Sequence, residues 1–228
     1  MKILGIETSS TIFSLSMYED KRLLCEIKRS RQSHSGARDA GLFTEARQLI
    51  DEFNKGEITA LAVSIGPGMF TSLRVGLSLA KGLALAKGIP AVAVNTLDVI
   101  GIPLSFTKEP VIAVINAFHQ EIYAAVYECG KRTSAYKLTT PDMVLDHIEG
   151  SAIIAGSGVD VFRKKGLAIN SEKLIFLEED FVLPSAVKVV SIALPRIKAK
   201  AFDDIEVLEP FYIKKTDAER NYNKINAP

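Results

Sequence analysis

The 228-residue sequence is poor in the residue types that mark disulfide-bonded and metal-binding proteins. It contains no tryptophan, two cysteines and three histidines. Cys25 and Cys129 lie far apart in apolar segments and form no CxxC pair, so we expect buried, reduced thiols. His34, His119 and His147 fall in separate segments, which predicts surface or cap positions rather than a metal site.

Net charge and long apolar runs are also lacking. The chain has 28 Lys+Arg against 27 Asp+Glu, a formal net charge of +1, so only a local basic patch could attract nucleic acid. No apolar run reaches the ~18 residues needed to span a bilayer. The opening "MKILGIETSS" is interrupted by Glu7 too soon to form the apolar region of a signal peptide. We therefore expect a cytoplasmic protein in a reducing compartment.

Hydrophobic residues make up 47% of the chain, enough for one large domain or two small ones. The apolar run at 2–7 and the alternating pattern at 12–18 predict a hairpin, with a third strand near 22–28. A buried strand at 58–65 leads into a Gly-Pro-Gly turn, a helix follows as far as Gly88, and 91–95 predicts another strand.

Between these strands, residues 36–53 have the apolar spacing of a helix. The predicted inward positions are Ala40, Phe43, Ala46, Ile50 and Phe53, with Asn54 and Gly56 closing the helix.

The second half of the chain repeats the order of the first. Residues 111–118 and 121–129 predict a second hairpin with its turn around His119 and Gln120, and 151–158 is a strand entering a Gly-rich turn. The proline-containing loop 101–110 predicts a boundary. We therefore expect an α/β protein of two related lobes, residues 1–103 with partner-binding helices and residues 104–228 with a basic tail.

Two turns are candidates for anion or metal binding. Gly66 and Gly68 allow positive φ around Pro67, and the amides at the start of the following helix favour an anion. Either Thr71 or Ser72 could cap that helix. Because the stretch lacks the Lys-Ser/Thr of a P-loop and the third glycine of a Rossmann turn, a phosphate cradle and a purely structural turn both remain open.

The turn "ETSS" after the first strand raises the same choice. The Glu7 carboxylate could coordinate magnesium through water, with Thr8 and Ser9 beside it, or it could stay solvated in a cleft between lobes.

The helix after the Gly-Pro-Gly turn carries a stripe of small residues. Ser72, Gly76, Ala80 and Ala84 recur every four residues, a spacing that lets a neighbouring backbone approach closely. Leucines surround the stripe, and Arg74, Lys81 and Lys87 would lie at its rim. The sequence alone leaves open whether the neighbour lies inside the lobe or in a partner protein.

The strings "LGIETSS", "GPGMFTSLRVGLSLAKGLA", "EIYAAVY" and "EPFYIKK" occur in the order found in the bacterial TsaB (YeaZ) family, which the chain resembles over nearly its whole length. It departs from the family at Met69, where serine is usual, and at Ser72, where glycine is usual. The resemblance implies an actin-like ATPase fold (sugar kinase, Hsp70, actin; ribonuclease H-like) and a paralogue of TsaD/Kae.

The resemblance also implies a function. TsaB-like proteins are non-catalytic partners of a TsaD-like transferase that forms N6-threonylcarbamoyladenosine next to the anticodon of tRNAs reading codons that begin with A. A TsaE-like P-loop ATPase joins the complex, and the protein is a homodimer when alone. The chain would then hold no cofactor of its own, ATP and a metal ion would belong to the partner proteins, and tRNA would bind only through the complex.

Two sets of site residues follow from the resemblance. The expected partner interface is Ser72, Leu73, Gly76, Leu77, Ala80, Leu83 and Ala84. The candidate nucleotide-binding residues are Glu7, Thr8, Ser9, Gly66 and Gly68.

Independent catalysis is not predicted. TsaD-like catalysts carry an HxxxH metal-binding pattern after the next strand, whereas 95–99 here supplies one carboxylate, Asp98, and no imidazole. Ser157 lacks the Gly-x-Ser-x-Gly pattern of a nucleophile elbow. The alternatives are a metal- or ATP-dependent enzyme of the superfamily, kinase or glycopeptidase-like, and a tRNA-binding module. The latter would use these tail residues: Tyr212, Lys214, Lys215, Arg220, Tyr222 and Lys224.

Overall fold

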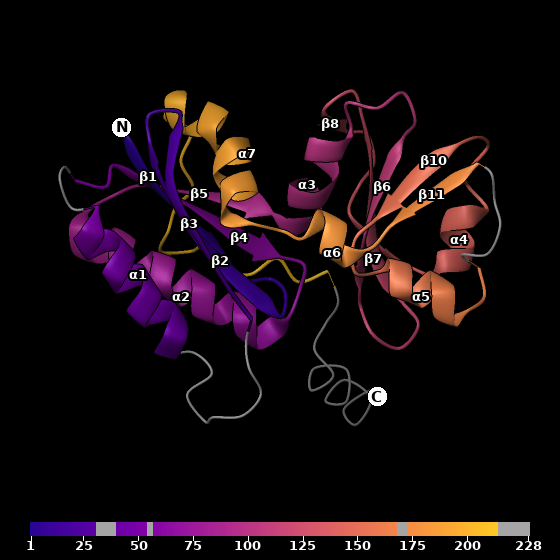
Figure 1. The fold of residues 1–228 in the computed structure, drawn as a ribbon, viewed down its shortest axis with the longest axis horizontal. Coiled ribbons are helices and arrows are strands. Elements are labelled where there is room, and N and C mark those ends of the chain that lie inside the picture. Colours follow the sequence, from indigo (N-terminus) through magenta and orange to yellow (C-terminus); the bar gives the residue numbers. More distant parts are fainter. Residues whose placement is uncertain (31–39, 54–56, 168–172, 214–228) are drawn as a thin grey trace, which may run out of the picture.

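The computed structural model describes residues 1–30, 40–53, 57–167 and 173–213. Figure 1 shows two lobes side by side, each built on one β-sheet with helices on both faces. The predictions for His34, for the helix end at 54–56 and for the basic tail from Lys214 onward lie outside the described residues.

The first sheet confirms the predicted hairpin and third strand. Its order is β3-β2-β1-β4-β5; β1 pairs with β2 and β2 with β3 antiparallel, whereas β1, β4 and β5 are parallel. All six positions of β1 are buried, as its unbroken apolar run requires. The strands are β1 (Lys2–Glu7), β2 (Ile12–Glu19), β3 (Arg22–Ser30), β4 (Ala60–Gly66) and β5 (Ala91–Asn95).

The second sheet repeats this arrangement. Its order is β11-β10-β6-β7-β8, with β9 also paired to β7; β6 and β7 are antiparallel, whereas β6, β10 and β11 are parallel. The prediction of two related lobes is therefore confirmed at the level of strand order. The strands are β6 (Val111–Asn116), β7 (Ile122–Glu128), β8 (Lys131–Arg132), β9 (Lys137–Thr139), β10 (Ala152–Ala155) and β11 (Leu174–Leu177).

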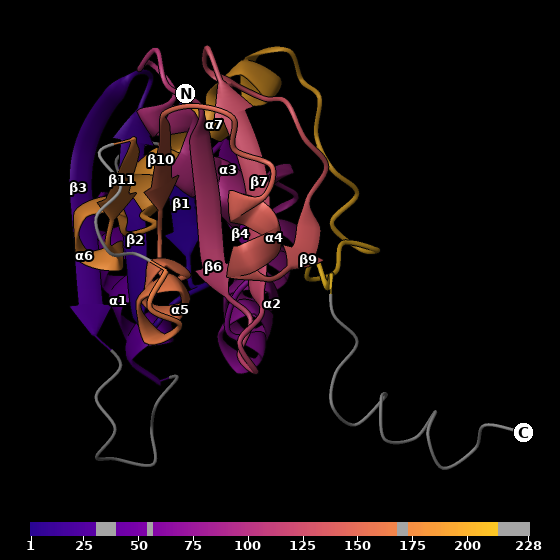
Figure 2. The same ribbon diagram turned by 90° about the vertical axis from the view of Figure 1, so that its right-hand side faces the viewer.

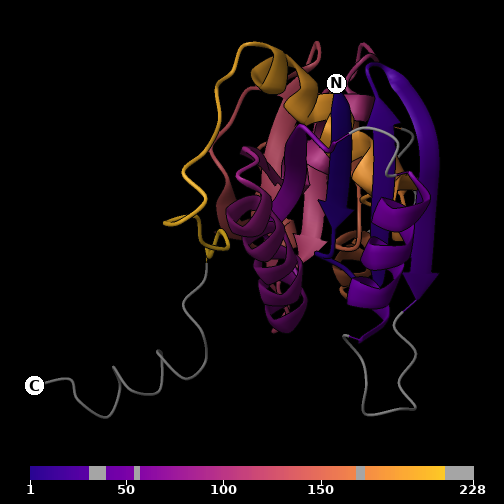
Figure 3. The same ribbon diagram turned by 90° about the vertical axis from the view of Figure 1, so that its left-hand side faces the viewer.

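Long helices cover the first sheet. Helices α1 (Ala40–Glu52) and α2 (Phe70–Lys87) lie on one face and α7 (Ala186–Lys198) on the other (Figures 1 and 3). Leu42, Ala46 and Leu49 form the buried face of α1, whereas Phe43 is 45% exposed. The expectation that Phe43 points inward was wrong, because the row beginning at Leu42 continues at the i+4 and i+7 positions and turns Phe43 to solvent.

Short helices cover the second sheet. Helix α3 (Thr96–Gly101), followed by the 3-10 turn η1 (Ile102–Leu104), packs with α6 (Glu179–Val182) on one face. Helices α4 (Pro141–Leu145) and α5 (Val159–Lys164) lie on the other, in front of β6, β7 and β10 in Figure 2.

Only part of residues 104–228 builds the second lobe. Helix α7 packs on β1, β4 and β5 of the first sheet. After it, the Asp203 amide donates to the Ala91 carbonyl (3.0 Å) and the Phe211 amide to the Ile65 carbonyl (2.7 Å). The C-terminal segment therefore returns to the first lobe, while the boundary after residue 103 stays a prediction.

Two sequence expectations concern membranes and thiols. Within the described residues, no helix is both long and apolar enough to cross a membrane. Cys25 is half-buried, whereas Cys129 is exposed. The expectation of burial was wrong for Cys129, because it lies in the turn between β7 and β8, at φ 50°.

Candidate functional site

The two lobes enclose a cleft of about 200 Å³. The first lobe contributes the turns after β1 and β4, and the second contributes the turns after β6 and β10 together with Glu179 of α6. Thr96 and Ile100 of α3, the helix that packs on the second sheet, also line the cleft. Loops at the carboxyl ends of parallel strands are the usual ligand sites of α/β sheets. The cleft is smaller than the roughly 300–1,000 Å³ of most ligand pockets.

Glu7 lies beneath this cleft and does not line it. Its side chain is 0% exposed, its Oε1 accepts a hydrogen bond from the Ser9 amide (2.5 Å), and its Oε2 has no hydrogen-bond partner among the described residues. Burial raises the pKa of the carboxyl, although the Ser9 and Ser64 hydrogen bonds and the charge of Lys188 oppose the shift. The alternative that Glu7 stays solvated was therefore wrong.

The Gly-Pro-Gly turn packs against the turn after β1. Gly66 has φ +104°, and a Cβ on Gly68 would collide with the Ser9 carbonyl oxygen. The Met69 amide donates to that same oxygen (2.8 Å), so one amide of the predicted cradle is already used. Helix α2 has Met69 as its N-cap without a side-chain cap bond, so neither Thr71 nor Ser72 caps it.

The charges in the cleft also disfavour a phosphate. Asp160 and Glu179 line it, and its described lining includes no lysine, arginine or histidine. Burial, followed by the charges of Asp180 and Asp160, raises the pKa of Glu179. Arg163, one turn after Asp160, forms a salt bridge with Glu178 (2.6 Å). Of the candidate nucleotide-binding residues, the structure brings Ser9 and Gly68 to the cleft and leaves Glu7, Thr8 and Gly66 outside its lining.

A catalytic metal of the HxxxH type does not fit the residues present. Thr96 and Ile100, four positions apart on α3, both line the cleft but offer one hydroxyl and one alkyl group. Among the described residues, no group of three or more His, Cys, Asp or Glu side chains could hold a metal ion. Asn95 instead caps α3, because its side chain accepts a hydrogen bond from the Leu97 amide (2.9 Å).

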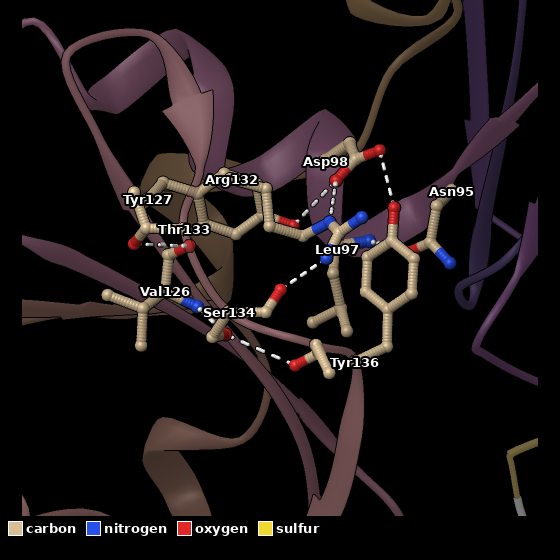
Figure 4. Close-up of polar contacts among 10 residues, drawn as sticks. Asn95, Leu97, Asp98, Val126, Tyr127, Arg132, Thr133, Ser134 and Tyr136 are labelled. Carbon is tan, nitrogen blue, oxygen red and sulfur yellow. Dashed lines mark hydrogen bonds and ion pairs between the residues drawn. The ribbon is translucent and has the colours of Figure 1, made fainter.

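Asp98, the one carboxylate of this stretch, has a structural use that the sequence did not reveal. It accepts hydrogen bonds from the hydroxyls of Tyr127 (2.8 Å) and Tyr136 (2.7 Å), and the Arg132 guanidinium lies 3.7 Å away (Figure 4). Burial, reinforced by Asp98, raises the pKa of both tyrosines. Arg132 also stacks over the Tyr136 ring at 4.0 Å. This network ties α3 to β7 and to the segment between β8 and β9.

The small-residue stripe of α2 is buried within its own lobe. Gly76 packs against the Thr8 side chain, which a Cβ would overlap, and Ala80 is 0% exposed. Ser72, Leu73, Leu77 and Ala84 are buried as well, and Leu83 is partly buried. The expectation that these residues face a partner is therefore corrected: the small side chains let α2 lie close to β1 and β4.

The opposite face of α2 is the one that solvent reaches. It carries Phe70, Arg74, Ser78, Gly82 and Leu85. Leu85 is 58% exposed, and a Cβ on Gly82 would meet no atom within 4 Å. At the N-terminal end, Tyr212 stacks on Phe70 with ring centroids 5.2 Å apart, and Arg74 Nε donates to the Tyr212 hydroxyl (3.1 Å). The sequence pattern does not reveal this face, because α2 is apolar over most of its circumference.

Comparisons with known proteins agree with this fold. The family model of TsaD, described as tRNA N6-adenosine threonylcarbamoyltransferase, matches residues 42–222. The chain is similar to the tRNA threonylcarbamoyladenosine biosynthesis protein TsaB of Escherichia coli, 27% identical with 96% of each chain covered. It is also similar to a tRNA N6-adenosine threonylcarbamoyltransferase of Dehalococcoides mccartyi, 36% identical over 42% of this chain and 34% of the relative.

Among solved structures, YeaZ from Pseudomonas aeruginosa has a similar fold, with a TM-score of 0.76 and 22% identity over 92% of this chain and 99% of that one. This likeness confirms the predicted α/β fold of two lobes, and the TsaB similarity over 96% of the chain confirms the resemblance predicted from the motifs. Because the family model covers most of its length, the chain belongs to the TsaD family, within which it resembles TsaB (YeaZ).

Proposed function

We propose that this chain is a non-catalytic partner of a TsaD-like transferase in the formation of N6-threonylcarbamoyladenosine in tRNA. The observation that carries the proposal is the extent of the two similarities. The match to E. coli TsaB covers 96% of both chains, whereas the match to the D. mccartyi transferase covers 34% of that enzyme. The chain therefore corresponds to a whole TsaB and to only a part of a transferase.

The cleft supports a non-catalytic role. A transferase or kinase of this fold needs a binding place for phosphates and a metal. Here the Met69 amide already donates a hydrogen bond to the Ser9 carbonyl, and the carboxylates of Asp160 and Glu179 line the cleft. Carboxylates repel phosphate unless a cation lies between them. In this proposal the chain has no cofactor of its own, and ATP and a metal ion act in the partner proteins.

The exposed face of α2 is the surface that we assign to the partner. The buried face of this helix belongs to the hydrophobic cluster of the first lobe, which fixes the helix on the sheet. Gly82 and Ser78 leave room for a second helix to approach, and Phe70 and Leu85 offer apolar side chains at 38% and 58% exposure. Helix pairing of this kind would serve a TsaD-like partner and, in its absence, a second copy of this chain.

The remaining members of the assembly follow from the same proposal. A TsaE-like P-loop ATPase would join the heterodimer, tRNA would bind only through the complex, and the assembly would act in the cytoplasm.

A co-purification experiment tests the proposal. We expect the tagged chain to capture a TsaD-like protein from its own cell. Gly82→Arg should abolish that capture, because the new side chain fills the space left for the partner helix. The variant should remain folded, since arginine is a better helix former than glycine.

Gly150→Arg is the matched control. A Cβ on Gly150 would likewise meet no atom within 4 Å, but Gly150 lies in the second lobe, and this variant should bind normally. Normal capture by a folded Gly82→Arg variant would reject the α2 surface. Failure of the unchanged chain to bind any TsaD-like protein would reject the partner function.

A further inference from the structure

Three side chains form a cluster at the N-terminal end of the exposed α2 face: Phe70, Arg74 and Tyr212. The Arg74 guanidinium lies 3.9 Å from the centroid of the Phe70 ring, on which the Tyr212 ring also stacks. In addition, Arg74 Nε donates to the Tyr212 hydroxyl (3.1 Å). These contacts restrict a long side chain that would otherwise sample many rotamers on the surface. The cluster therefore holds a positive charge in one place.

The cluster is fixed to the fold on both sides. Phe70 and Arg74 are one turn apart on α2, whose buried side packs in the hydrophobic cluster of the first lobe. Tyr212 follows Phe211, whose backbone amide donates to the Ile65 carbonyl at the end of β4 (2.7 Å). The position of the guanidinium is thus set by two separate segments of the chain.

The charge of Arg74 is not neutralised within the described residues. Arg74 forms no salt bridge there, and the 18 residues of α2 include no Asp or Glu. By contrast, the exposed side chains of Arg29, Arg47 and Arg163 each have a carboxylate partner. Because Tyr212 takes up only the Nε–H of Arg74, the N–H groups of both Nη atoms are left for a ligand.

Building on the proposed partner function, we propose that Arg74 binds a carboxylate of the partner protein. This carboxylate would be an Asp or Glu on the helix that packs along Ser78 and Gly82, which follow Arg74 on the same face of α2. A guanidinium holds a carboxylate through charge-assisted N–H···O bonds of fixed geometry. Arginine and aromatic side chains are also the types that contribute most to the affinity of protein interfaces.

A protein carboxylate suits this position better than the α2 helix of a second copy or a nucleic acid. Pairing of α2 with itself would bring Arg74 toward another helix without an acidic residue. Nucleic acid binding needs several cations along a track, but the ammonium of Lys81, the next basic side chain of α2, donates to the Glu206 carbonyl (3.0 Å). Around Arg74 the surface instead offers the apolar side chains of Phe70 and Leu85.

The affinity of the full chain for the purified TsaD-like protein of its own cell tests the proposal. We expect Arg74→Glu to weaken the heterodimer about thirtyfold or more, because it places a negative charge against the partner's carboxylate. Arg74→Lys keeps the charge but loses the planar guanidinium, so its affinity should lie between those of the parent and Arg74→Glu. Lys164→Glu, the same charge reversal on α5 of the second lobe, should bind like the parent.

The salt dependence of the affinity separates an ion pair from a packing role. Between roughly 0.05 and 0.5 M NaCl, the affinity of the parent should fall more steeply than that of Arg74→Gln, which has no charge to screen. If Arg74 only covered the Phe70 ring, its replacement would lower the melting temperature and leave the salt dependence unchanged. Circular dichroism melts check that each variant is folded, and Arg74→Gln decides by the same criteria if Arg74→Glu does not fold.

Several outcomes would overturn the proposal while leaving the partner function standing. These are parent-like affinity in a folded Arg74→Glu variant and equal salt dependence in the parent and Arg74→Gln. Unchanged heterodimer affinity with weakened self-association would assign Arg74 to a second copy, and the same affinity with weakened tRNA binding by the complex would assign it to a phosphate. Failure of the unchanged chain to bind the TsaD-like protein would instead reject the partner function itself.

Discussion

The two lobes have the same strand order and directions but very different helices. In the first lobe α1 and α2 have 13 and 18 residues, whereas their counterparts α4 and α5 have 5 and 6. The long pair buries one face against the sheet and still presents a broad outer face to solvent (Figure 1). The shared topology thus fixes where the strand ends meet, while helix length decides which lobe offers a surface to another protein.

In the turn after the first strand of each lobe, a side-chain oxygen at the strand end accepts a hydrogen bond from a backbone amide, but the two side chains differ. Glu7 Oε1 accepts from the amide two residues later, and at the corresponding position Asn116 Oδ1 accepts from the Phe118 amide (2.8 Å). The first turn is buried and carries an ionisable group, whereas in the second Phe118 is 66% exposed and has a positive φ. Burying the ionisable carboxyl of Glu7 therefore costs folding free energy in the first lobe, whereas the neutral amide of Asn116 avoids this cost in the second.

The turns after β4 in the first lobe and β10 in the second are also equivalent. Gly66–Gly68 and Gly156–Gly158 both begin with a glycine in the left-handed region, at φ +104° and +119°. Both end with a glycine at a close approach, to the Ser9 backbone in the first lobe and to Val114 in the second.

The largest expected effect concerns the buried stripe of α2. Ala80→Arg should unfold the first lobe, because an arginine would enter a fully buried site without a partner, at a cost of about 3–5 kcal/mol or more. Ser78→Arg, two residues away on the exposed face, should melt like the parent. Circular dichroism melts compare the two, and a native melt for Ala80→Arg would restore the stripe as an external surface.

A smaller effect is expected at the paired glycine turns. Gly68→Val should destabilise the protein by about 1–3 kcal/mol, since the side chain would overlap Ser9. Gly158→Val should cost a similar amount, because its Cβ would lie 2.8 Å from the Val114 Cβ. Thermal melts measure both, with the open position Gly150→Val as control. An unchanged melt for either turn variant would break the equivalence of the two turns.

Glu7→Gln should make the first turn resemble the second and stabilise the fold by about 1–2 kcal/mol at pH 7. Burial raises the pKa of Glu7 above its usual 4.5, so the folded state holds this proton more tightly than the unfolded state. The contribution of Glu7 to stability is thus most favourable below pH 4.5 and falls as the pH rises from there to the folded pKa. Urea unfolding at intervals of about one pH unit between pH 4 and 8 should show this fall in the free energy of unfolding of the parent, whereas Glu7→Gln should not show it. The same pH dependence in both proteins would contradict the raised pKa of Glu7.

The smallest expected effect is that of ATP on the isolated chain. Because the two turns of the first lobe pack on each other and the cleft is acidic, ATP with magnesium or zinc should be hydrolysed no faster than in buffer. We also expect the purified chain to hold no stoichiometric zinc or iron. Phosphate release and metal analysis provide the measurements. Turnover that disappears in Glu7→Ala would favour the enzyme alternative instead.

The strand pattern could be predicted locally, but the site could not. The alternation of 12–18, the apolar run of 2–7 and the turns between them depend on neighbours in the sequence, and both hairpins form as expected. The partners of Asp98 lie 29 and 38 residues away, and no short-range signal pairs a carboxylate with Tyr127 or Tyr136.

By itself, the sequence determined the two related lobes, the hairpin that opens each of them, and the likeness to TsaB, because periodicity and motif spacing are carried by local residues. The tertiary structure alone decided which side of α2 faces solvent. Small residues every four positions allow close packing against any neighbour, and only the placement of Thr8 beneath Gly76 shows that the neighbour is the chain's own sheet. The tertiary structure likewise decided the burial of Glu7. The pKa of this carboxyl depends chiefly on the segments that cover it, which the neighbouring residues in the sequence do not specify.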